Sequence, residues 1–472
     1  MLRTKIVCTL GPSSATPEVI GALVSAGLDM ARINMSHGSH ETHERTIGLV
    51  REAALAAGRP VAVLADLAGP KIRVGDLAES IPLVPGQRVV LVPSGTESNG
   101  EIPTTYPALA HDLKPGNRVL LDDGLLELEA CPSEGRKAVL TVVRGGMLRS
   151  RKGINLPGVN VAAPSLTPKD EVDLDFALRC GVEYVGLSFV RRASDVTALQ
   201  EKVKRRALVI AKIEKASALA DIEEVLAEAD GVMVARGDLG VELPFEQVPL
   251  AQKKIIQAAN YFGRPVITAT QMLESMIEQP RPTRAEASDA ANAVLDGTDA
   301  LMLSGETATG KYPIQACEAL VRIAREIERS GVLERGPRYL TRPGDGGRSG
   351  ASPREHAIAS ATVEAARQMG APAILVITRS GFSARLVSSY RPAIPIFAIC
   401  NDPETFRQLA PVWGVRPVLW TEPDVSYESL TSFGKKCVLE SGLGRQGDVV
   451  VVTAGVPFHT SGSTNTMRVE QL

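Results

Sequence analysis

Charged and hydroxyl-bearing side chains recur directly after short apolar runs of this chain. Lys212 and Glu214 follow one run with a single residue between them, so on a strand both side chains point to the same face. Arg32, Asn34 and Ser36 alternate in the same way at an earlier run. The ends of the other runs carry Asp66, Arg236, Gly237, Asp238, Thr270, Gln271, Ser304 and Glu306, and Arg73 comes shortly after Asp66.

These side chains form a site only if the ends of the runs meet in one place. A lysine and a glutamate at a buried strand end are costly unless they face each other, a ligand or a metal ion. Two carboxylates, Glu214 and Asp238, without a Cys/His cluster favour a hard cation such as Mg2+ or Mn2+ over zinc. Several cations beside such an ion suit phosphoryl transfer. A structural network of salt bridges is the alternative interpretation.

The apolar runs also indicate which elements position these residues. Ala-rich segments with helical spacing lie between them, as at 41–57, 246–261 and 285–295. Eight strand–helix alternations predict a (β/α)8 barrel, whose active sites form at the carboxyl ends of the strands. An open, doubly wound sheet is the alternative. The eight runs are Lys5–Thr9, Met30–Ile33, Val61–Leu64, Tyr184–Leu187, Leu208–Ile213, Val232–Ala235, Val266–Thr268 and Ala300–Leu303.

Two other regions break the barrel rhythm. Residues 70–165 hold Pro- and Gly-punctuated β-rich runs and a hairpin turn at Asp122-Asp123-Gly124, which predicts a small inserted β-domain that acts as a lid. After a Gly/Arg/Pro/Ser-rich linker at 331–352, a second alternation predicts a C-terminal α/β domain with a mostly parallel sheet. We therefore expect a barrel at 1–69 and 166–345, an insert at 70–165 and a C-terminal domain at 346–472.

Composition excludes several classes of protein. The 472 residues contain 52 Lys+Arg against 54 Asp+Glu, a net charge of -2, so no global charge favours nucleic acid or an anionic membrane. No apolar run approaches the length of a membrane span, and the first residues lack the pattern of a secretory signal. The six cysteines are scattered without a CxxC pair, which indicates reduced thiols. We expect a cytoplasmic protein.

An active-site segment and six further long blocks resemble the pyruvate kinase family in family order, and the resemblance covers nearly the whole chain. It implies a barrel, a small inserted β-barrel and a C-terminal α/β domain, usually in a homotetramer. It also implies an enzyme that transfers a phosphoryl group from phosphoenolpyruvate to ADP, giving pyruvate and ATP in the last step of glycolysis. The active-site segment is Val209–Lys215, and the other blocks are Ala31–Gly38, Lys152–Gly158, Met233–Gly240, Ala269–Ser275, Pro280–Glu286 and Leu303–Thr307.

The resemblance also assigns roles near the transferred phosphoryl group. Glu214 and Asp238 would hold the Mg2+ ion, for which Mn2+ is a possible substitute. Lys212 would neutralise charge on the phosphoryl oxygens, and Arg32 and Arg73 would grip phosphate groups. Gly237 and Asp238 would offer backbone N–H groups to the substrate carboxylate. Thr270 would contact the substrate near C3 and support proton transfer through water. Structural alternatives are an ion pair for Lys212, a surface pair for Arg73, a plain turn for Gly237 and a helix N-cap for Thr270.

The nucleotide site implied by the resemblance uses residues from both the barrel and the insert. Asn34, His37 and Arg73 would approach the nucleotide phosphates, and Lys152 would reach them from the insert when the lid closes. Closure would also exclude water. A solvated surface lysine is the alternative for Lys152.

One position departs from the commonest family pattern. Most members have Glu where this chain has Lys71, and they require K+. The residues resembling the K+ ligands are Asn34, Ser36, Asp66 and Leu67, the last through its backbone carbonyl. An ammonium group at position 71 supplies the positive charge covalently and would repel a second cation. We therefore expect activity without K+; a Lys71 that only points to solvent is the alternative.

The C-terminal domain carries a phosphate-cradle pattern. Thr378, Arg379, Ser380, Gly381, Phe382 and Ser383 lie between a predicted strand and a predicted helix, where hydroxyls and free N–H groups bind phosphate. The family's effector loop occupies the matching segment, and Thr460–Thr466 would close over it. We expect activation by a phosphorylated metabolite; a helix cap with an unliganded loop is the alternative.

Two other functions remain open from the residues. A lyase acting on pyruvate or phosphoenolpyruvate would share the Mg2+ carboxylates, but it would not need the insert or Lys152. A non-enzymatic sensor of sugar phosphates should have lost Lys212, Glu214, Asp238 or Thr270, and this chain keeps all four.

Overall fold

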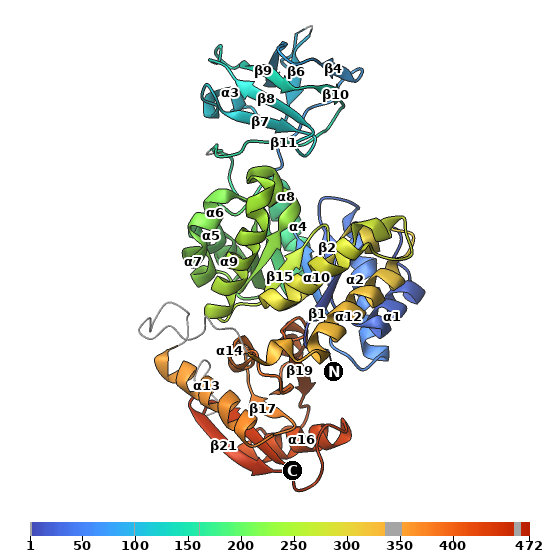
Figure 1. Ribbon diagram of the computed structural model, residues 1–472, viewed down its shortest axis with the longest axis vertical. Helices are drawn as coiled ribbons and strands as arrows, with labels where there is room; N and C mark the ends of the chain where they lie inside the picture. Colours follow the sequence, from blue (N-terminus) through green and yellow to red (C-terminus); the bar gives the residue numbers. More distant parts are fainter. Residues whose placement is uncertain (1, 99, 160, 336–351, 457–463) are drawn as a thin grey trace.

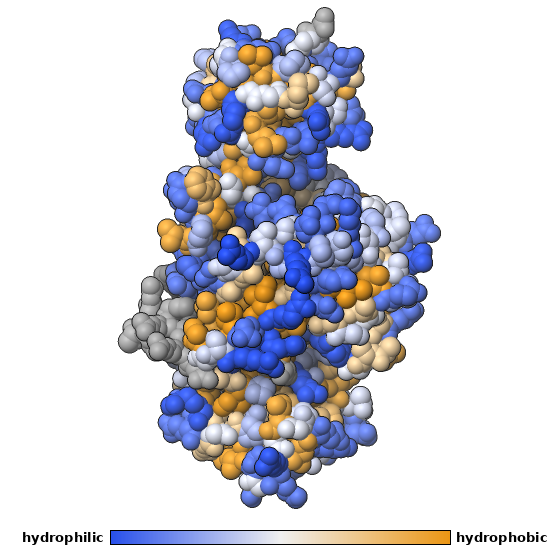
Figure 2. Space-filling view, turned by 45° about the vertical axis from the view of Figure 1, so that its right-hand side comes forward, coloured by the Kyte–Doolittle hydropathy of each residue, from blue (hydrophilic) through white to orange (hydrophobic). Residues whose placement is uncertain are grey.

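The computed structural model describes residues 2–98, 100–159, 161–335, 352–456 and 464–472. It arranges the chain as three blocks along one long axis, with the β-rich insert at the top, the barrel in the middle and the C-terminal α/β block at the bottom (Figure 1). The space-filling view shows the insert as a separate lobe with an indentation between it and the barrel (Figure 2). Across the described residues, every helix falls short of the length and apolar character that a membrane crossing needs.

The predicted eight-stranded barrel is confirmed. Its parallel strands close in the order β1-β16-β15-β14-β13-β12-β3-β2, so β1 pairs with both β2 and β16, and the open doubly wound sheet is excluded. The strands are β1 (Lys5–Leu10), β2 (Leu28–Asn34), β3 (Ala62–Asp66), β12 (Tyr184–Leu187), β13 (Leu208–Ile213), β14 (Gly231–Ala235), β15 (Val266–Ala269) and β16 (Ala300–Leu303).

Helices cover the outside of the barrel and give it two apolar layers. The outward side chains of the strands pack against the helices, and the inward ones, including Met30, Leu64 and Met233, fill the interior. The helices are α1 (Pro17–Ala26), α2 (His40–Ala56), α4 (Pro168–Arg179), α5 (Ala193–Val203), α6 (Ala216–Ala220), α7 (Ile222–Glu228), α8 (Arg236–Glu242), α9 (Val248–Tyr261), α10 (Arg284–Asp296), α11 (Gly305–Ala308) and α12 (Pro313–Arg329), with short 3-10 turns at Phe245–Gln247, Glu274–Ile277 and Val332–Arg335.

Local sequence explains where several of these helices begin. Ser39, Thr167 and Thr283 each cap a helix by a reciprocal capping box, and proline stands in the first turn of α1, α4, α9 and α12. These signals fix where each helix begins, and the segments between the strand ends and these helices carry polar side chains.

The insert forms its own small β-structure around a separate apolar core. A six-stranded sheet runs in the order β11-β7-β8-β9-β5-β6, beside a ribbon of β10 and β4. Residues 73 and 74 bridge Gly153 beside β11 and Thr104 in β6, so one short segment links both edges of the sheet in the way a small barrel closes. Its elements are β4 (Ile81–Leu83), β5 (Arg88–Pro93), β6 (Ile102–Thr104), α3 (Leu109–Asp112), β7 (Arg118–Leu121), β8 (Leu126–Ala130), β9 (Ala138–Arg144), β10 (Gly146–Leu148) and β11 (Ile154–Asn155). The predicted hairpin at 122–124 joins β7 to β8, and all three turn residues have positive φ.

The C-terminal block has a five-stranded sheet in the order β19-β18-β17-β20-β21, parallel except for the β20–β21 pair. The mostly parallel sheet is thus confirmed. Its elements are α13 (Pro353–Gln368), β17 (Ile374–Ile377), α14 (Phe382–Ser389), β18 (Ile396–Cys400), α15 (Pro403–Gln408), β19 (Val415–Leu419), α16 (Tyr427–Glu440), β20 (Val449–Ala454) and β21 (Thr466–Gln471).

This block is fastened to the amino-terminal floor of the barrel, at the end opposite the polar loops. Arg391 donates to Asp299 through Nη2 at 2.7 Å in a buried pair. Arg407 pairs with Glu183 at 2.5 Å, and the Tyr184 hydroxyl donates to the Gln408 carbonyl at 2.5 Å.

Candidate active site

Lys212, at the end of β13, lies at the centre of the polar end of the barrel. Its Nζ donates to Ser188 Oγ at 2.7 Å and lies 3.1 Å from Asp66 Oδ1 and 3.0 Å from Glu214 Oε1. Burial alone would lower the pKa of Lys212, but the charges of Asp66 and Glu214 outweigh burial and raise its pKa to about 12. Lys212 is therefore a fixed, buried positive charge.

Asp66 joins two cations that come from different strands. Arg32 donates to Asp66 Oδ2 through Nε at 2.7 Å and through Nη2 at 2.6 Å, while Lys212 faces the other carboxylate oxygen. A further guanidinium nitrogen of Arg32 donates to Thr9 Oγ1 at 3.0 Å. Burial would raise the pKa of Asp66, but the charges of Lys212 and Arg32 hold its pKa below the ordinary value. Asp66 thus stays ionised and orients both cations.

Glu214 and Asp238 leave negative charge that the protein does not fully compensate. Glu214 is 1% exposed, pairs with Lys212, and accepts a hydrogen bond from the Phe189 N–H at 2.7 Å. Burial, together with the nearby Asp238 charge, raises the pKa of Glu214 despite Lys212. Lys212 is stabilised by two carboxylates, so its pKa rises. Glu214 shares that one ammonium with Asp66, so burial still raises the pKa of Glu214. Within the described residues, the half-buried Asp238 carboxylate makes no hydrogen bond or ion pair. The arrangement of these two carboxylates therefore favours binding of an additional cation.

Thr270 and Gly237 join the loops that follow β15 and β14. The Thr270 hydroxyl donates to the Ala269 carbonyl at 2.7 Å and accepts from the Gly237 N–H at 2.8 Å. Thr270 and Gln271 have φ of 65° and 52°, a left-handed conformation that is unusual for a β-branched residue and costs about 1–3 kcal/mol per residue. The alternative of Thr270 as a helix N-cap is excluded, because no helix begins at 271.

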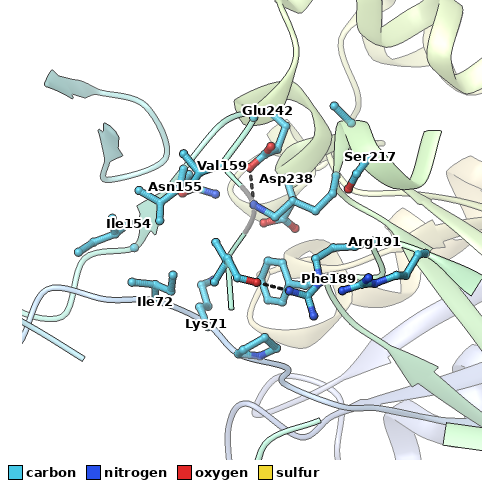
Figure 3. A pocket seen from close by; sticks show the side chains of 18 of the residues that line it. Lys71, Ile72, Ile154, Asn155, Val159, Phe189, Arg191, Ser217, Asp238 and Glu242 are labelled. Carbon is cyan, nitrogen blue, oxygen red and sulfur yellow. Dashed lines mark hydrogen bonds and ion pairs between the residues drawn. The ribbon is translucent and has the colours of Figure 1, made fainter. Parts of the chain in front are cut away.

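A cleft opens between the insert and this end of the barrel. It holds a cavity of about 300 Å³ lined by Lys71 and Ile72, by Ile154, Asn155 and Val159 of the insert, and by Phe189, Arg191, Ser217, Asp238 and Glu242 of the barrel (Figure 3). Lys215 pairs with Glu242 within the barrel. Arg191 donates to the Val161 carbonyl at 2.5 Å, so this barrel side chain holds the segment that returns from the insert.

The sequence-predicted residues from the insert stand apart from the Lys212 cluster. Arg73 donates through Nη1 to the Arg151 carbonyl at 2.9 Å. Lys152 pairs with Asp122 at 2.8 Å, within the insert. His37 is exposed on the loop after β2. The structure thus brings together Arg32, Asp66, Lys212 and Glu214 by direct contacts, but not Arg73, Lys152 or His37.

The residues that resemble K+ ligands lie around the ends of β2 and β3. Asn34 Oδ1 accepts from the Ser36 N–H at 3.1 Å, and the Leu67 carbonyl accepts from Ser188 Oγ at 2.6 Å. Lys71 is exposed and lines two cavities that also contain Asp123 and Asp238. In the part of the chain that the structure describes, no hydrogen bond or ion pair joins the Lys71 ammonium to Asn34, Ser36 or Asp66.

The predicted effector loop lies at the start of α14, far from the cleft. Gly381, at φ 75°, precedes the helix without a side-chain cap, and Ser383 Oγ contacts Thr464 Oγ1 at 2.6 Å. Thr378, Gly381 and Ser383 are buried, whereas Arg379 and Ser380 are exposed. Arg385, on α14, donates to the Ser380 carbonyl at 3.2 Å and has a buried Nη1 with no partner among the described atoms. Of the predicted closing segment 460–466, residues 460–463 lie outside the described residues.

Sequence reasoning missed several residues that complete the site. Thr9 and Ser188 bind the two central cations through hydroxyl groups, and neither belongs to a charged pattern. Arg236 was expected to add a cation to the cleft, but its guanidinium is buried against backbone carbonyls of the loop after β15. Glu306 is likewise committed, accepting from the Leu273 and Ser304 N–H groups at 3.0 and 2.7 Å. Partners of this kind come from strands distant in sequence, so no local spacing marks them.

Comparisons with known proteins cover both the barrel and the C-terminal block. The family described as "Pyruvate kinase, barrel domain" matches residues 1–317, and "Pyruvate kinase, alpha/beta domain" matches residues 356–470. A pyruvate kinase of Geobacillus stearothermophilus is 45% identical over 475 residues, spanning 99% of this chain and 80% of that protein. One from Mycobacterium tuberculosis is 44% identical, spanning 100% of this chain and 98% of that protein. A crystal structure of a pyruvate kinase from Cryptosporidium parvum superposes with a TM-score of 0.91 at 34% identity, covering 100% of this chain and 96% of that one.

Proposed function

The chain belongs to the pyruvate kinase family of enzymes, and from this premise we propose that it transfers the phosphoryl group of phosphoenolpyruvate to ADP, giving pyruvate and ATP as the last step of glycolysis. The observation that carries the proposal is the buried Lys212 ammonium held between Asp66 and Glu214, beside an Asp238 carboxylate that faces the cleft. A phosphoryl group entering this cleft meets a fixed positive charge that needs no reorganisation.

The residues at the cleft fit a divalent cation of the Mg2+ type. Glu214 has a raised pKa because it is buried near Asp238, so a cation between these carboxylates relieves their repulsion. The described residues contain no group of three or more His, Cys, Asp or Glu side chains arranged for a metal. Two carboxylates suit Mg2+, which keeps waters and binds substrate phosphates. When bound, the ion would neutralise charge on the substrate's oxygens; Mn2+ has the same ligand preference.

The chain's own residues would bind and orient the phosphoryl group. Lys212 would neutralise charge on its equatorial oxygens during transfer. Arg32 keeps a guanidinium edge fixed by Asp66 and Thr9, so it would bind phosphate with little loss of side-chain entropy. Gly237 and Asp238 stand at the start of the short helix α8 and would line the place of the substrate carboxylate; the Asp238 N–H would bind it, while the Gly237 N–H donates to Thr270 Oγ1.

Protonation of the enolate at C3 would involve Thr270 through water. The Thr270 hydroxyl already donates to Ala269 and accepts from Gly237, and an alcohol is a poor acid. Thr270 would therefore position a water beside C3, not give up its own proton. The proton would come from solvent along that water.

Binding of the nucleotide would require the insert to close. The proposed nucleotide contacts are Asn34, His37, Arg73 and Lys152. Arg73 lies in the segment that bridges to Gly153 in the insert, and Lys152 pairs with Asp122 of the insert's hairpin turn. Lys152 would exchange its 2.8 Å contact with Asp122 for a nucleotide phosphate. We propose the division into a barrel at 1–69 and 166–345, a lid at 70–165 and a regulatory domain at 346–472 on this basis.

Three further parts of the proposal concern ions, regulation and assembly. Lys71 would replace K+ as the positive charge near the cleft, because its exposed ammonium carries no carboxylate partner among the described residues. A phosphorylated metabolite would bind at 378–383 and activate the enzyme, supported by the uncapped start of α14 and the unpartnered Nη1 of Arg385. The active form would be a cytoplasmic homotetramer, as the family resemblance implies.

A coupled assay of pyruvate formation tests the reaction. The purified full chain should form pyruvate from phosphoenolpyruvate only when ADP and a divalent cation are both present. A lyase would form product without ADP, and a sensor would form none; either result would contradict the proposal.

A further inference from the structure

Arg236 is a buried arginine whose guanidinium points at backbone carbonyls instead of the cleft. Its side chain is 9% exposed and comes from the first residue of α8. Nη2 donates to the Thr270 carbonyl at 2.7 Å and to the Gln271 carbonyl at 3.1 Å, and Nε lies 3.3 Å from the Ala269 carbonyl. One guanidinium thus binds three consecutive carbonyls of the loop after β15.

Those carbonyls belong to the two left-handed residues. Thr270 and Gln271 both have positive φ, and neither is glycine. Such a conformation persists only when its surroundings fix it. The guanidinium of Arg236 binds the carbonyls of both residues, so its contacts favour this conformation.

In this conformation the Thr270 hydroxyl faces Gly237, the residue that follows Arg236 in α8. Thr270 Oγ1 accepts from the Gly237 N–H at 2.8 Å, and Asp238 follows directly. A Cβ at Gly237 would lie 3.4 Å from Thr270 Oγ1, so the two loops are in close contact. Asp289 anchors the far side of the guanidinium through Nη1 at 2.7 Å.

We propose that Arg236 is a positioning residue for Thr270: it holds the left-handed turn that sets the Thr270 hydroxyl against Gly237, and thereby places the water that delivers the C3 proton. This role rests on the proposed function. Arg236 itself touches no substrate. Lysine cannot replace it, because one ammonium cannot span three carbonyls in the geometry of a planar guanidinium.

The test compares Arg236→Lys with the wild-type chain in two assays: steady-state pyruvate formation, and exchange of the C3 protons of pyruvate with deuterated water. We expect kcat and the exchange rate to fall together by about 10²-fold, with KM for phosphoenolpyruvate changed less than about threefold, because misplacement affects the proton step more than binding. A loss confined to KM, or exchange at the wild-type rate, would overturn the proposal.

A second substitution separates positioning from a general structural effect. Gln271→Gly removes the conformational penalty of one left-handed residue, so added to Arg236→Lys it should recover about tenfold of the lost kcat. No recovery would show that the turn is not what Arg236 holds. If Arg236→Lys fails to fold, Asp289→Asn perturbs the guanidinium from its exposed side and should lower kcat and exchange together by a smaller factor; unchanged rates in that variant would overturn the proposal.

Arg264 provides the matched control. Its guanidinium donates to the Leu226 and Ala227 carbonyls, both at 3.2 Å, and in the described part of the chain it makes no hydrogen bond or ion pair with a residue of the cleft. Arg264→Lys should leave both kcat and the exchange rate within about threefold of the wild type, and a joint fall as large as that of Arg236→Lys would overturn the assignment. If the wild-type chain shows no turnover, both the proposed function and this role are contradicted. If the wild type turns over and Arg236→Lys keeps the wild-type kcat and exchange rate, only the role of Arg236 is contradicted.

Discussion

Replacing Lys212 by methionine removes the central charge while keeping most of the side-chain volume. Nζ contacts Asp66 and Glu214 at 3.1 and 3.0 Å, so among the described residues the change leaves Glu214 with the Phe189 N–H as its one remaining partner. Loss of one electrostatic stabiliser typically lowers turnover by about 10³-fold, which corresponds to about 4 kcal/mol of barrier. Enolisation of bound pyruvate should suffer less, because no phosphoryl group moves in that step.

The same change should also lower the free energy of unfolding, and the size of this loss should depend on pH. Breaking a buried ion pair costs about 3–5 kcal/mol because a charge is left unpaired. The pKa of Glu214 is already raised by burial, and without Lys212 it should rise further. A carboxyl with a raised folded-state pKa loses stability as pH rises from its unfolded pKa of 4.5 through the folded value. The stability deficit of Lys212→Met should therefore be smallest in acid and grow towards neutral pH.

The assay measures turnover and the free energy of unfolding for Lys212→Met and for a control, Lys5→Met. Lys5 is also buried, donates to the Val415 carbonyl at 2.8 Å and lies near Asp29, but at the opposite end of the barrel. The control should lose stability and keep wild-type turnover. Near-normal turnover in Lys212→Met, or an equal loss in Lys5→Met, would refute the assignment of Lys212.

Four further predictions follow from the site and the effector loop. Asp238→Asn should weaken Mn2+ binding, measured by electron paramagnetic resonance without substrate, by at least about tenfold; unchanged affinity would remove Asp238 from the metal site. Turnover of the wild type should be nearly the same without K+ and at saturating K+ at matched ionic strength, whereas Lys71→Glu should lower activity without K+ and make K+ stimulatory; a wild type almost inactive without K+ would refute the role of Lys71. A phosphoenolpyruvate titration with a panel of phosphorylated metabolites should reveal an activator whose effect is lost in Ser383→Ala, and unchanged affinity across the panel, with no phosphate or sulfate bound at 378–383 in crystals, would contradict this. The pKa of Asp66 is held below its ordinary 3.8 by Lys212 and Arg32, so its contribution to the free energy of unfolding is present above pH 3.8 and lost as pH falls below it; a wild-type advantage over Asp66→Asn that persists undiminished in stronger acid would show that these pairs do not stabilise the fold.

The strands of the barrel were predictable because each is an apolar run buried on both faces. All eight predicted runs correspond to barrel strands: three match at both ends, and the ends of the others are shifted by at most two residues. The C-terminal sheet was less readable at its edges. β19 has exposed Arg416 and contains Pro417, and β21 alternates partly exposed residues, so neither forms an apolar run. The helix α15 spans only Pro403–Gln408, too short for a helical period to show.

Some residues of the site were likewise predictable from the sequence, and others were not. Spacing along β13 and β2 placed Lys212, Glu214 and Arg32 on inward faces, and the barrel closure brought them together. The partners that fix them, Thr9 and Ser188, depend on strands far apart in sequence. The buried position of Arg236 depends on a backbone turn with positive φ at Thr270, and the sequence does not predict positive φ for a threonine.

The most direct test of the central claim follows the phosphorus atom itself. In a 31P nuclear magnetic resonance time course with the purified full chain, Mg2+, ADP and phosphoenolpyruvate, the substrate phosphorus signal should decline as the γ-phosphate signal of ATP grows one for one, with pyruvate forming at the same rate. Release of the phosphorus as inorganic phosphate, or no change in either signal, would contradict phosphoryl transfer at the Lys212 site.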